Sequence, residues 1–405
     1  MRTFNIPAFY RSSLIQKIKE YRKTQDPKRR DFSPTILNFG KIKYYIPRHF
    51  GFCYGVENAI EIAFKAIEEN PDKRIYLLSQ MIHNPEVNKD LQERGIQFLQ
   101  DTYGNTLIDF SELKDNDVVI IPAFGAPLEI LDKIKQFNIQ TYFYDTTCPF
   151  VERVWKKAQQ IGSQNYTIII HGKYKHEETR ATFSRAKKYN HAVIIRDIEE
   201  AKKLAPYILE QKSQKEFEAE FKDKYSEGFN IYQHFQKIGV INQTTMLASE
   251  TEEISNYLKN VMIQKYGESN INEHFADTHD TLCYATNENQ TSVLNLLHSD
   301  ADLAIVVGGY NSSNTSHLVE LLQTKFPTYF ISSYREILSK EKIRHFDLNK
   351  KEVVETIQFL PQKDELKVII TGGASCPDSL LDEVIIRINE LLNVSDTERL
   401  EVLNV

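Results

Sequence analysis

The sequence predicts an α/β protein with three small domains and mostly parallel sheets. From residue 43 onward, short runs of β-branched and aromatic residues alternate with amphipathic stretches, and a polar turn follows each run. Continuous apolar strands of this kind are typical of parallel sheets that helices cover on both faces. Because ligands bind at the carboxyl ends of the strands in such sheets, we expect the functional residues in these polar turns.

Six apolar runs are interpreted as strands. In chain order they are residues 74–78, 117–121, 166–170, 238–241, 303–307 and 367–370. Each run has the length of a strand and consists mainly of β-branched, aromatic or other apolar residues, and a turn rich in Gly, Asn, Ser, Thr or Pro comes directly or shortly after it. The stretches between the runs have room for the helices that connect parallel strands.

The cysteine-containing turns separate the predicted domains. We expect an N-terminal extension over 1–45, α/β domains over 46–145, 146–280 and 281–375, and a C-terminal segment over 376–405 that packs back on the core. The extension has weak helical periodicity over 11–21 and a basic turn at 26–30. A charged run near 211–228 in the middle domain is interpreted as a solvated helical insertion.

The composition excludes several classes of protein. The 405 residues are 41% hydrophobic, which suffices for a large core, and the net charge of −6 gives no reason to expect nucleic acid or an anionic membrane as a partner. Four widely spaced cysteines do not make a disulfide framework, and no apolar run is long enough to cross a bilayer. We therefore expect a cytoplasmic protein, or one of the plastid stroma if its source has plastids.

Three of the four cysteines lie in turns at or near the start of a helix-like stretch. At Cys53, Cys148 and Cys283, backbone N–H groups and the helix dipole favour the thiolate over the thiol. Each cysteine alone is as well explained by a buried structural thiol. Together, with Gly and Pro around them, they indicate one shared metal centre. With three protein ligands, such a centre keeps an open coordination position.

Six short motifs carry a family resemblance. They are residues 51–60, 82–85, 147–149, 283–287, 311–314 and 373–375. In this order they resemble the motifs of 4-hydroxy-3-methylbut-2-enyl diphosphate reductase, the last enzyme family of the methylerythritol phosphate route to isoprenoids. The resemblance covers about residues 45 to 390. The N-terminal extension and the long middle insertion are more similar to the plant and cyanobacterial branch than to the short bacterial form.

The resemblance implies an iron-sulfur oxidoreductase whose three domains surround one central 4Fe-4S cluster, with Cys53, Cys148 and Cys283 as ligands. The implied reaction is the reductive dehydroxylation of 4-hydroxy-3-methylbut-2-enyl diphosphate to isopentenyl and dimethylallyl diphosphate. Glu178 is the expected proton donor, and Thr244 is its hydrogen-bonding partner at the substrate hydroxyl. Because the chain has no flavin or nicotinamide signature, an external donor such as ferredoxin or flavodoxin is expected to supply the electrons.

The resemblance also assigns contacts to the substrate, chiefly to its diphosphate. The residues are His83, His176, Thr245, Ser312, Ser313, Asn314 and Ser375. Histidines supply charge-assisted donors, and a Gly- and Ser-rich loop before a helix can hold an anion. Each histidine is equally well explained as a satisfied loop residue, and such loops are often simple turns. Phe124 stands where many bacterial members of the family carry a histidine, so one phosphate donor is missing.

Two other classes of function stay open. If Cys376 also bound the cluster, every iron would be capped and the protein would be an electron carrier or sensor. In the family a small residue that is not a ligand normally stands at this position, so we expect Cys376 to pack near the pocket. A hydro-lyase with a three-cysteine cluster would remove water without electrons.

Overall fold

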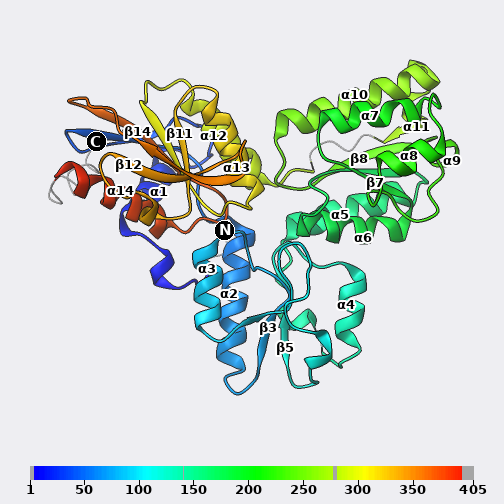
Figure 1. The fold of residues 1–405 in the computed structure, drawn as a ribbon, viewed down its shortest axis with the longest axis horizontal. Helices are drawn as coiled ribbons and strands as arrows, with labels where there is room; N and C mark the ends of the chain where they lie inside the picture. Colours follow the sequence, from blue (N-terminus) through cyan, green and yellow to red (C-terminus); the bar gives the residue numbers. More distant parts are fainter. Residues whose placement is uncertain (1–3, 140, 277–280, 395–405) are drawn as a thin grey trace. The chain divides into compact units, whose positions relative to one another are not determined.

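The computed structural model of the chain describes residues 4–139, 141–276 and 281–394 (Figure 1). Contacts divide the chain into two compact units. Unit 1 comprises Met1–Glu57, Ile82–Asp90 and Tyr284–Val405, and unit 2 comprises Asn58–Met81 and Leu91–Cys283. The expected domain boundary at residue 280 and the last residues of the expected C-terminal segment, 395–405, lie outside the described residues.

A five-stranded sheet forms the centre of unit 1 (Figure 1). Its strands, in spatial order, are β1 (Thr35–Asn38), β2 (Ile42–Ile46), β14 (Leu366–Gly372), β10 (Leu303–Val307) and β11 (Thr328–Ile331). The β1–β2 pair is antiparallel, and the other pairs in this sheet are parallel. A separate antiparallel hairpin consists of β12 (Lys342–Asp347) and β13 (Glu352–Ile357).

Helices cover both faces of this sheet. The helices are α1 (Ser13–Gln25), α12 (Tyr284–Leu296), α13 (Ser313–Gln323) and α14 (Asp378–Leu392). Alternate residues of β10 point to opposite faces. Leu303 and Ile305 therefore pack with α1 and α14, whereas Ala304 and Val306 pack with α12 and α13. The result is a three-layer unit with one apolar cluster on each side of the sheet.

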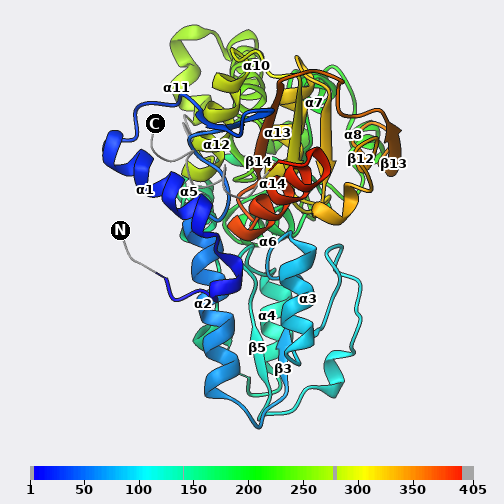
Figure 2. The same ribbon diagram turned by 90° about the vertical axis from the view of Figure 1, so that its left-hand side faces the viewer.

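The N-terminal segment is part of the core of unit 1. Helix α1 begins after Ser12, whose hydroxyl accepts a hydrogen bond from the Ile15 N–H at 3.2 Å, a typical N-cap. The helix lies beside α14 (Figure 2) and buries Leu14, Ile15 and Ile18 in the apolar cluster of that face. Residues 1–45, expected to be an added extension, thus supply a helix, the whole of β1 and most of β2.

Unit 2 contains two fully parallel sheets. The three-stranded sheet has the order β4 (Gln97–Phe98), β3 (Ile75–Leu77) and β5 (Val118–Ile120). The four-stranded sheet has the order β7 (Ala192–Ile195), β6 (Thr167–His171), β8 (Ile238–Asn242) and β9 (Phe275–Ala276). The α/β class with mostly parallel sheets is therefore confirmed, and all six predicted strands are present.

Helices connect the strands of unit 2. They are α2 (Tyr54–Glu69) and α3 (Pro85–Glu93), which both begin in unit 1, and α4 (Leu128–Lys135), α5 (Pro149–Gly162), α6 (Glu177–Tyr189), α7 (Ile198–Ile208), α8 (Gln214–Glu220), α9 (Ile231–His234), α10 (Ala248–Tyr266) and α11 (Ile271–His274). Helices α5 and α6 cover one face of the four-stranded sheet, and α7 and α10 cover the other (Figure 1).

The charged run in unit 2 is helical but not fully solvated. Its charged residues around α8 are mostly exposed, as expected from the sequence. Phe217 and Phe221, however, are almost completely buried and stack on each other with their ring centroids 5.3 Å apart. They pack with Tyr207 and Phe229 in the apolar cluster under α7. The run therefore packs its aromatic residues into the main apolar cluster on one face of the four-stranded sheet.

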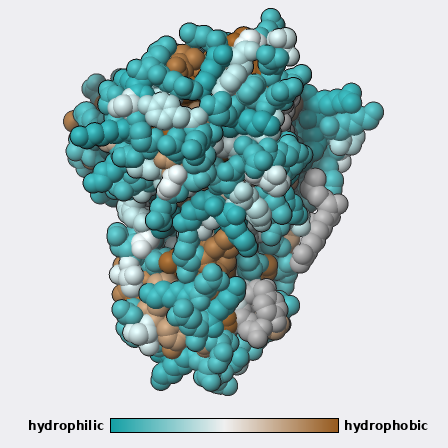
Figure 3. Space-filling model, turned by 90° about the vertical axis from the view of Figure 1, so that its right-hand side faces the viewer, coloured by the Kyte–Doolittle hydropathy of each residue, from teal (hydrophilic) through white to brown (hydrophobic). Residues whose placement is uncertain are grey.

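The outer surface agrees with the composition. None of the helices in the described ranges is both long enough and apolar enough to cross a membrane. Figure 3 shows one face of the molecule, on which hydrophilic residues predominate and hydrophobic residues form small groups.

Replacing Phe217 by alanine will test the packing of the aromatic residues in the charged run. We expect the free energy of unfolding to fall by about 3 to 4 kcal/mol, because the change leaves a cavity among buried rings. Lys215→Ala, at an exposed position on the same helix, is the control and should change it by less than about 0.5 kcal/mol. Urea unfolding followed by circular dichroism measures both. Equal effects of the two substitutions would contradict the buried position of Phe217.

Candidate functional site

Unit 2 brings Glu178 and Thr244 into direct contact. Glu178 lies in the first turn of α6. Strand β8 ends at Asn242, and Thr244 is the second residue after it, next to Gln243. The Thr244 backbone N–H donates to Glu178 Oε1 at 2.6 Å, and the Thr244 hydroxyl donates to Oε2 at 3.0 Å. Glu178 is 1% exposed. Burial raises the pKa of this carboxyl to about 7, although both hydrogen bonds from Thr244 lower it. Such a group holds a proton near neutral pH.

Gln243 orients the loops around this pair, and its role was missed in the sequence. Its side-chain Oε1 accepts hydrogen bonds from the Thr179 hydroxyl at 3.1 Å and from the Lys173 N–H at 3.2 Å. Its Nε2 donates to the Thr245 hydroxyl at 2.8 Å. Gln243 therefore links the turn after β8 to the turn after β6. The one signal in the sequence was its position in the polar turn after the predicted strand 238–241.

His176 is the N-cap of α6. Its Nδ1 accepts a hydrogen bond from the Glu178 N–H at 3.2 Å, so the neutral ring carries its proton on Nε2, the nitrogen suited to donate to an anion. The Phe124 ring contacts the His176 ring edge to face, with 5.7 Å between centroids. Phe124 thus contributes packing against a predicted phosphate ligand rather than a donor of its own.

Two of the three motif cysteines belong to unit 2. Cys148 caps the start of α5, and its N–H donates to the Ala123 carbonyl at 2.9 Å. The Cys283 N–H donates to the Thr244 carbonyl at 3.1 Å. Thr244 therefore joins the protonatable carboxyl of Glu178 to the cysteine turn at 283.

The pKa of Cys148 differs from the expectation for a helix start. Burial raises the pKa of this thiol to about 12, and the nearby Cys283 and Glu178 raise it further. The N–H groups of Phe150 and Val151 lower the pKa, as expected at a helix N-terminus, but burial outweighs them. The prediction that this position favours the thiolate is therefore wrong for the metal-free chain.

Unit 1 gathers the remaining site residues around the turn after β14. The Cys53 N–H donates to the Ala374 carbonyl at 3.2 Å, which ties the cysteine turn to this loop. The Ser375 hydroxyl donates to the His83 carbonyl at 3.0 Å. The Ala374 N–H in turn donates to Asn314 Oδ1 at 2.9 Å. Cys53, His83, Asn314 and Ser375 therefore share one edge of the five-stranded sheet.

The side-chain amide of Asn314 has an unused hydrogen-bond donor at this edge of the sheet. Its Oδ1 accepts hydrogen bonds from Ala374 and, at 3.4 Å, from Asn289, and the residue is 3% exposed. Its buried Nδ2 has no hydrogen-bond partner within the part of the chain that the structure describes. Buried donors are almost always paired, so this nitrogen is suited to a ligand oxygen.

The start of α13 has the form of an anion-binding turn. The Ser312 hydroxyl caps the helix, accepting from the Thr315 N–H at 3.2 Å and from the Thr315 hydroxyl at 3.0 Å. Ser313 is the first residue of the helix and is almost completely buried. The first backbone N–H groups of a helix attract negative charge.

Two glycines allow the loops of this edge to approach one another. A side chain at Gly309 would overlap with the carbonyl group of His83, and one at Gly373 would overlap with Thr315. Both positions therefore require glycine for close packing, whatever their backbone dihedrals. The glycines hold the turns after β10 and β14 against their neighbours.

Cys376 differs from the other three cysteines. It is completely buried in the apolar cluster between α14 and the sheet, and burial raises its pKa well above the usual value. None of the four is in a disulfide, and the other three are partly exposed. This environment is that of a packing residue, and it does not favour the fourth-ligand alternative.

The residues present suit an iron-sulfur cluster with three thiolate ligands. Cys53, Cys148 and Cys283 are not in disulfides, and each directly precedes a helix, namely α2, α5 and α12. Cys53 belongs to unit 1, and the other two belong to unit 2. Within the described ranges, no three His, Cys, Asp or Glu side chains form a ready metal-binding group. The shared centre thus stays a prediction based on the donor set.

Parallel α/β sheets, three cysteines at helix starts and a protonatable buried carboxyl suit an enzyme with a metal centre and an acid group. The family model described as "LytB protein" matches residues 45–389. The chain belongs to this family. Curated relatives named 4-hydroxy-3-methylbut-2-enyl diphosphate reductase include that of Picosynechococcus sp., 38% identical over 94% of this chain and 89% of the relative. That of Gloeobacter violaceus is 37% identical over 97% of this chain and 90% of the relative.

Solved structures share the fold. The reductase from Plasmodium falciparum is 23% identical, with a TM-score of 0.62 over 86% of this chain and 88% of that one. A second structure, described as the terminal enzyme of the non-mevalonate pathway, is 22% identical, with a TM-score of 0.51 over 85% of this chain and 98% of that one.

Alkylation of the metal-free native protein will test whether Cys376 is buried while the other three cysteines are accessible. A small thiol reagent should modify the partly exposed Cys53 and Cys283 first and Cys148 more slowly, because burial raises the pKa of the Cys148 thiol to about 12 and only the thiolate reacts. Cys376 should stay unmodified, because it is completely buried. Peptide mass spectrometry over a time course gives the rate at each site. Modification of Cys376 at the rate of the others would contradict its place in the core.

Proposed function

We propose that this chain catalyses the reductive dehydroxylation of 4-hydroxy-3-methylbut-2-enyl diphosphate to isopentenyl and dimethylallyl diphosphate. One observation carries the proposal: Thr244 hydrogen-bonds to the protonatable carboxyl of Glu178 through its N–H and hydroxyl, and to the Cys283 turn through its carbonyl. An acid is thereby joined to a candidate iron ligand. The names of curated relatives that align with 94% of the chain support the same reaction.

The proposed cofactor is one 4Fe-4S cluster held by Cys53, Cys148 and Cys283. When bound, it would supply electrons and an open iron that acts as a Lewis acid. The three cysteines at helix starts support this assignment, and so does the burial of Cys376.

The protein side chains perform the acid and binding steps. The substrate C–O bond breaks, its oxygen leaves as water, and a proton reaches either end of the allyl group, which gives the two products. Two electrons and two protons balance the reaction. Glu178 supplies protons, and the Thr244 hydroxyl, with Thr245 next to it, orients the substrate hydroxyl.

We propose that the diphosphate is bound by two kinds of hydrogen-bond donor, histidines and short polar side chains. They are His83, His176, Ser312, Ser313, Asn314 and Ser375. The buried Nδ2 of Asn314 and the capped start of α13 support this assignment for unit 1. The Nε2–H tautomer of His176 supports it for unit 2.

The electrons come from an external protein donor, for which we propose ferredoxin or flavodoxin. Four cysteines outside disulfides suit a reducing compartment, so we place the activity in the cytoplasm or, in a plastid-bearing source, in the plastid stroma.

Glu178→Gln will test the acid assignment. The amide keeps the shape of the side chain but has no proton to give, so turnover should fall at least about 100-fold while the iron content stays unchanged. Turnover is measured with a low-potential dye as the electron source, in the absence of oxygen. The control is Glu152→Gln, an exposed carboxyl on α5, which should keep the wild-type rate. A Glu178→Gln variant that turns over as fast as wild type would refute the assignment.

Iron and sulfide analysis of cysteine variants will test the cluster assignment. Oxygen-free reconstitution should load wild type with about four irons and four sulfides per chain. Cys53→Ala, Cys148→Ala and Cys283→Ala should each lose most of this iron, because each removes a ligand. Cys376→Ala should retain it. Normal iron content in any of the first three variants would show that this cysteine is not a ligand.

A further inference from the structure

The N-terminal segment covers the turn that carries Cys53. Aromatic residues occupy every second position of this turn, at 50, 52 and 54, and each ring contacts a different residue of the segment. The pairs are Lys19 with Phe50, whose ring centroid is 5.0 Å from Nζ, Tyr10 with Phe52 at 5.9 Å between centroids, and Phe4 with Tyr54 at 4.9 Å. Phe4, Tyr10 and Phe50 are buried by these contacts and their neighbours. Side chains of the segment thus lie against the turn before and after Cys53.

Polar contacts anchor the segment in this position. Lys19 forms an ion pair with Asp378 at 2.7 Å, at the start of α14. The Tyr10 hydroxyl donates to Asp90 at 2.8 Å, and the Ser12 hydroxyl donates to Asp382 at 2.9 Å. These partners come from α3 and α14, so several distant parts of unit 1 hold the segment against the turn.

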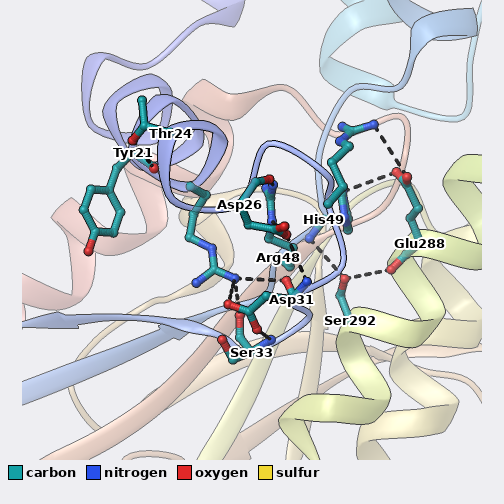
Figure 4. A network of polar contacts seen from close by, with 11 residues as sticks. Tyr21, Thr24, Asp26, Asp31, Ser33, Arg48, His49, Glu288 and Ser292 are labelled. Carbon is teal, nitrogen blue, oxygen red and sulfur yellow. Dashed lines mark hydrogen bonds and ion pairs between the residues drawn. The ribbon is translucent and has the colours of Figure 1, made fainter.

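A second set of contacts lies at the other end of the segment (Figure 4). Arg48, 8% exposed, has its charge opposed by Asp26 at 3.7 Å. His49 Nδ1 lies 3.3 Å from Glu288 on α12, and Arg29 of the segment lies 3.5 Å from the same carboxylate. Burying the charge of Arg48 without an acidic partner would be unfavourable, whereas burial lowers the pKa of His49 to about 4 and leaves its ring neutral near pH 7. The loop after α1 therefore stabilises the chain that leads into the Cys53 turn.

Helix α12 contacts the same stretch of chain along one face. The Tyr284 hydroxyl accepts a hydrogen bond from the Tyr54 N–H at 3.0 Å, and Ser292 Oγ accepts one from the His49 N–H at 3.1 Å. Tyr284, Glu288 and Ser292 are spaced by four residues, which puts them on one side of the helix. The residue after Cys53 is therefore hydrogen-bonded to the residue after Cys283.

We propose that residues 4–33 are a positioning and shielding element for the Cys53 turn, with Tyr10 and Lys19 as its positioning residues. The segment fixes the turn through its aromatic residues and limits the access of water and oxygen to the thiolate. The inference rests on the proposed function, since Cys53 is a metal ligand there. In this proposal the N-terminal segment holds a ligand turn of the metal site in place, although no residue of the segment is itself a ligand.

Site-resolved alkylation of the metal-free protein tests the proposal without the cluster. Tyr10→Ala removes the ring over Phe52 and should raise the rate of Cys53 modification about fivefold or more, because local opening controls the access of a reagent. Tyr21→Ala, an exposed tyrosine on α1, is the matched control and should leave the rate unchanged. In both variants the rates at Cys148 and Cys283 should stay at their wild-type values. A Cys53 rate in Tyr10→Ala equal to wild type would overturn the proposal.

Cys376 reports whether unit 1 has stayed folded, because it is completely buried in the same unit. If Tyr10→Ala also exposes Cys376, the variant has disturbed the fold of unit 1, and Lys19→Met is then the test. This substitution removes the cation over Phe50 and the ion pair to Asp378 but keeps the aliphatic part of the side chain. A faster Cys53 reaction with Cys376 still protected supports the proposal. An unchanged Cys53 rate contradicts it.

The same variants can be followed after reconstitution with iron and sulfide. Loss of iron absorbance in air should be several-fold faster in Tyr10→Ala than in Tyr21→Ala. Equal rates of loss would contradict shielding. A wild-type chain that binds no iron would refute the proposed function instead, and the alkylation rates would still decide the role of the segment.

Discussion

The parallel pairing of neighbouring strands is the constraint on which both sets of site residues depend. In unit 2, β6 and β8 end level with each other, with His171 paired to Asn242. In unit 1, β10 and β14 end with Val307 paired to Gly372. The chain leaves each pair at the same edge of its sheet, so the following turns must lie side by side. Glu178 meets Thr244, and Asn314 meets the turn at 374, because of this register.

Burial then sets the chemistry of the groups at these edges. Desolvation raises the pKa of both Glu178 and Cys148, to about 7 and about 12, and in each case hydrogen bonds from backbone N–H groups oppose it only in part. For the carboxyl, the consequence is that a proton stays bound near neutral pH, as the proposed acid role of Glu178 requires. For the thiol, a coordinated metal would be the partner that makes the thiolate favourable, because a bound cation is the largest local charge in such a site.

The sequence predicted those features that depend on local pattern. Six strands were found from their apolar runs, and the candidate site turns were predicted from the polar residues that follow those strands. Contacts between distant residues left no such signal. Gln243 is recognisable as a link only when Thr179 and Lys173 are seen beside it. The N-terminal segment looked like an added extension because its periodicity is weak, yet Leu14, Ile15 and Ile18 are core residues. The burial that outweighs the helix N-terminus at Cys148 is likewise a property of the folded chain.

The central claim is that this chain removes a hydroxyl group by reduction. Its most direct test is to count electrons and products together, using reduced, cluster-loaded protein and 4-hydroxy-3-methylbut-2-enyl diphosphate in the absence of oxygen. The account predicts that two electrons are consumed for each diphosphate converted, with isopentenyl and dimethylallyl diphosphate as the products. Loss of water without consumption of electrons would identify a hydro-lyase and contradict it, as would a fully loaded cluster that turns over no substrate.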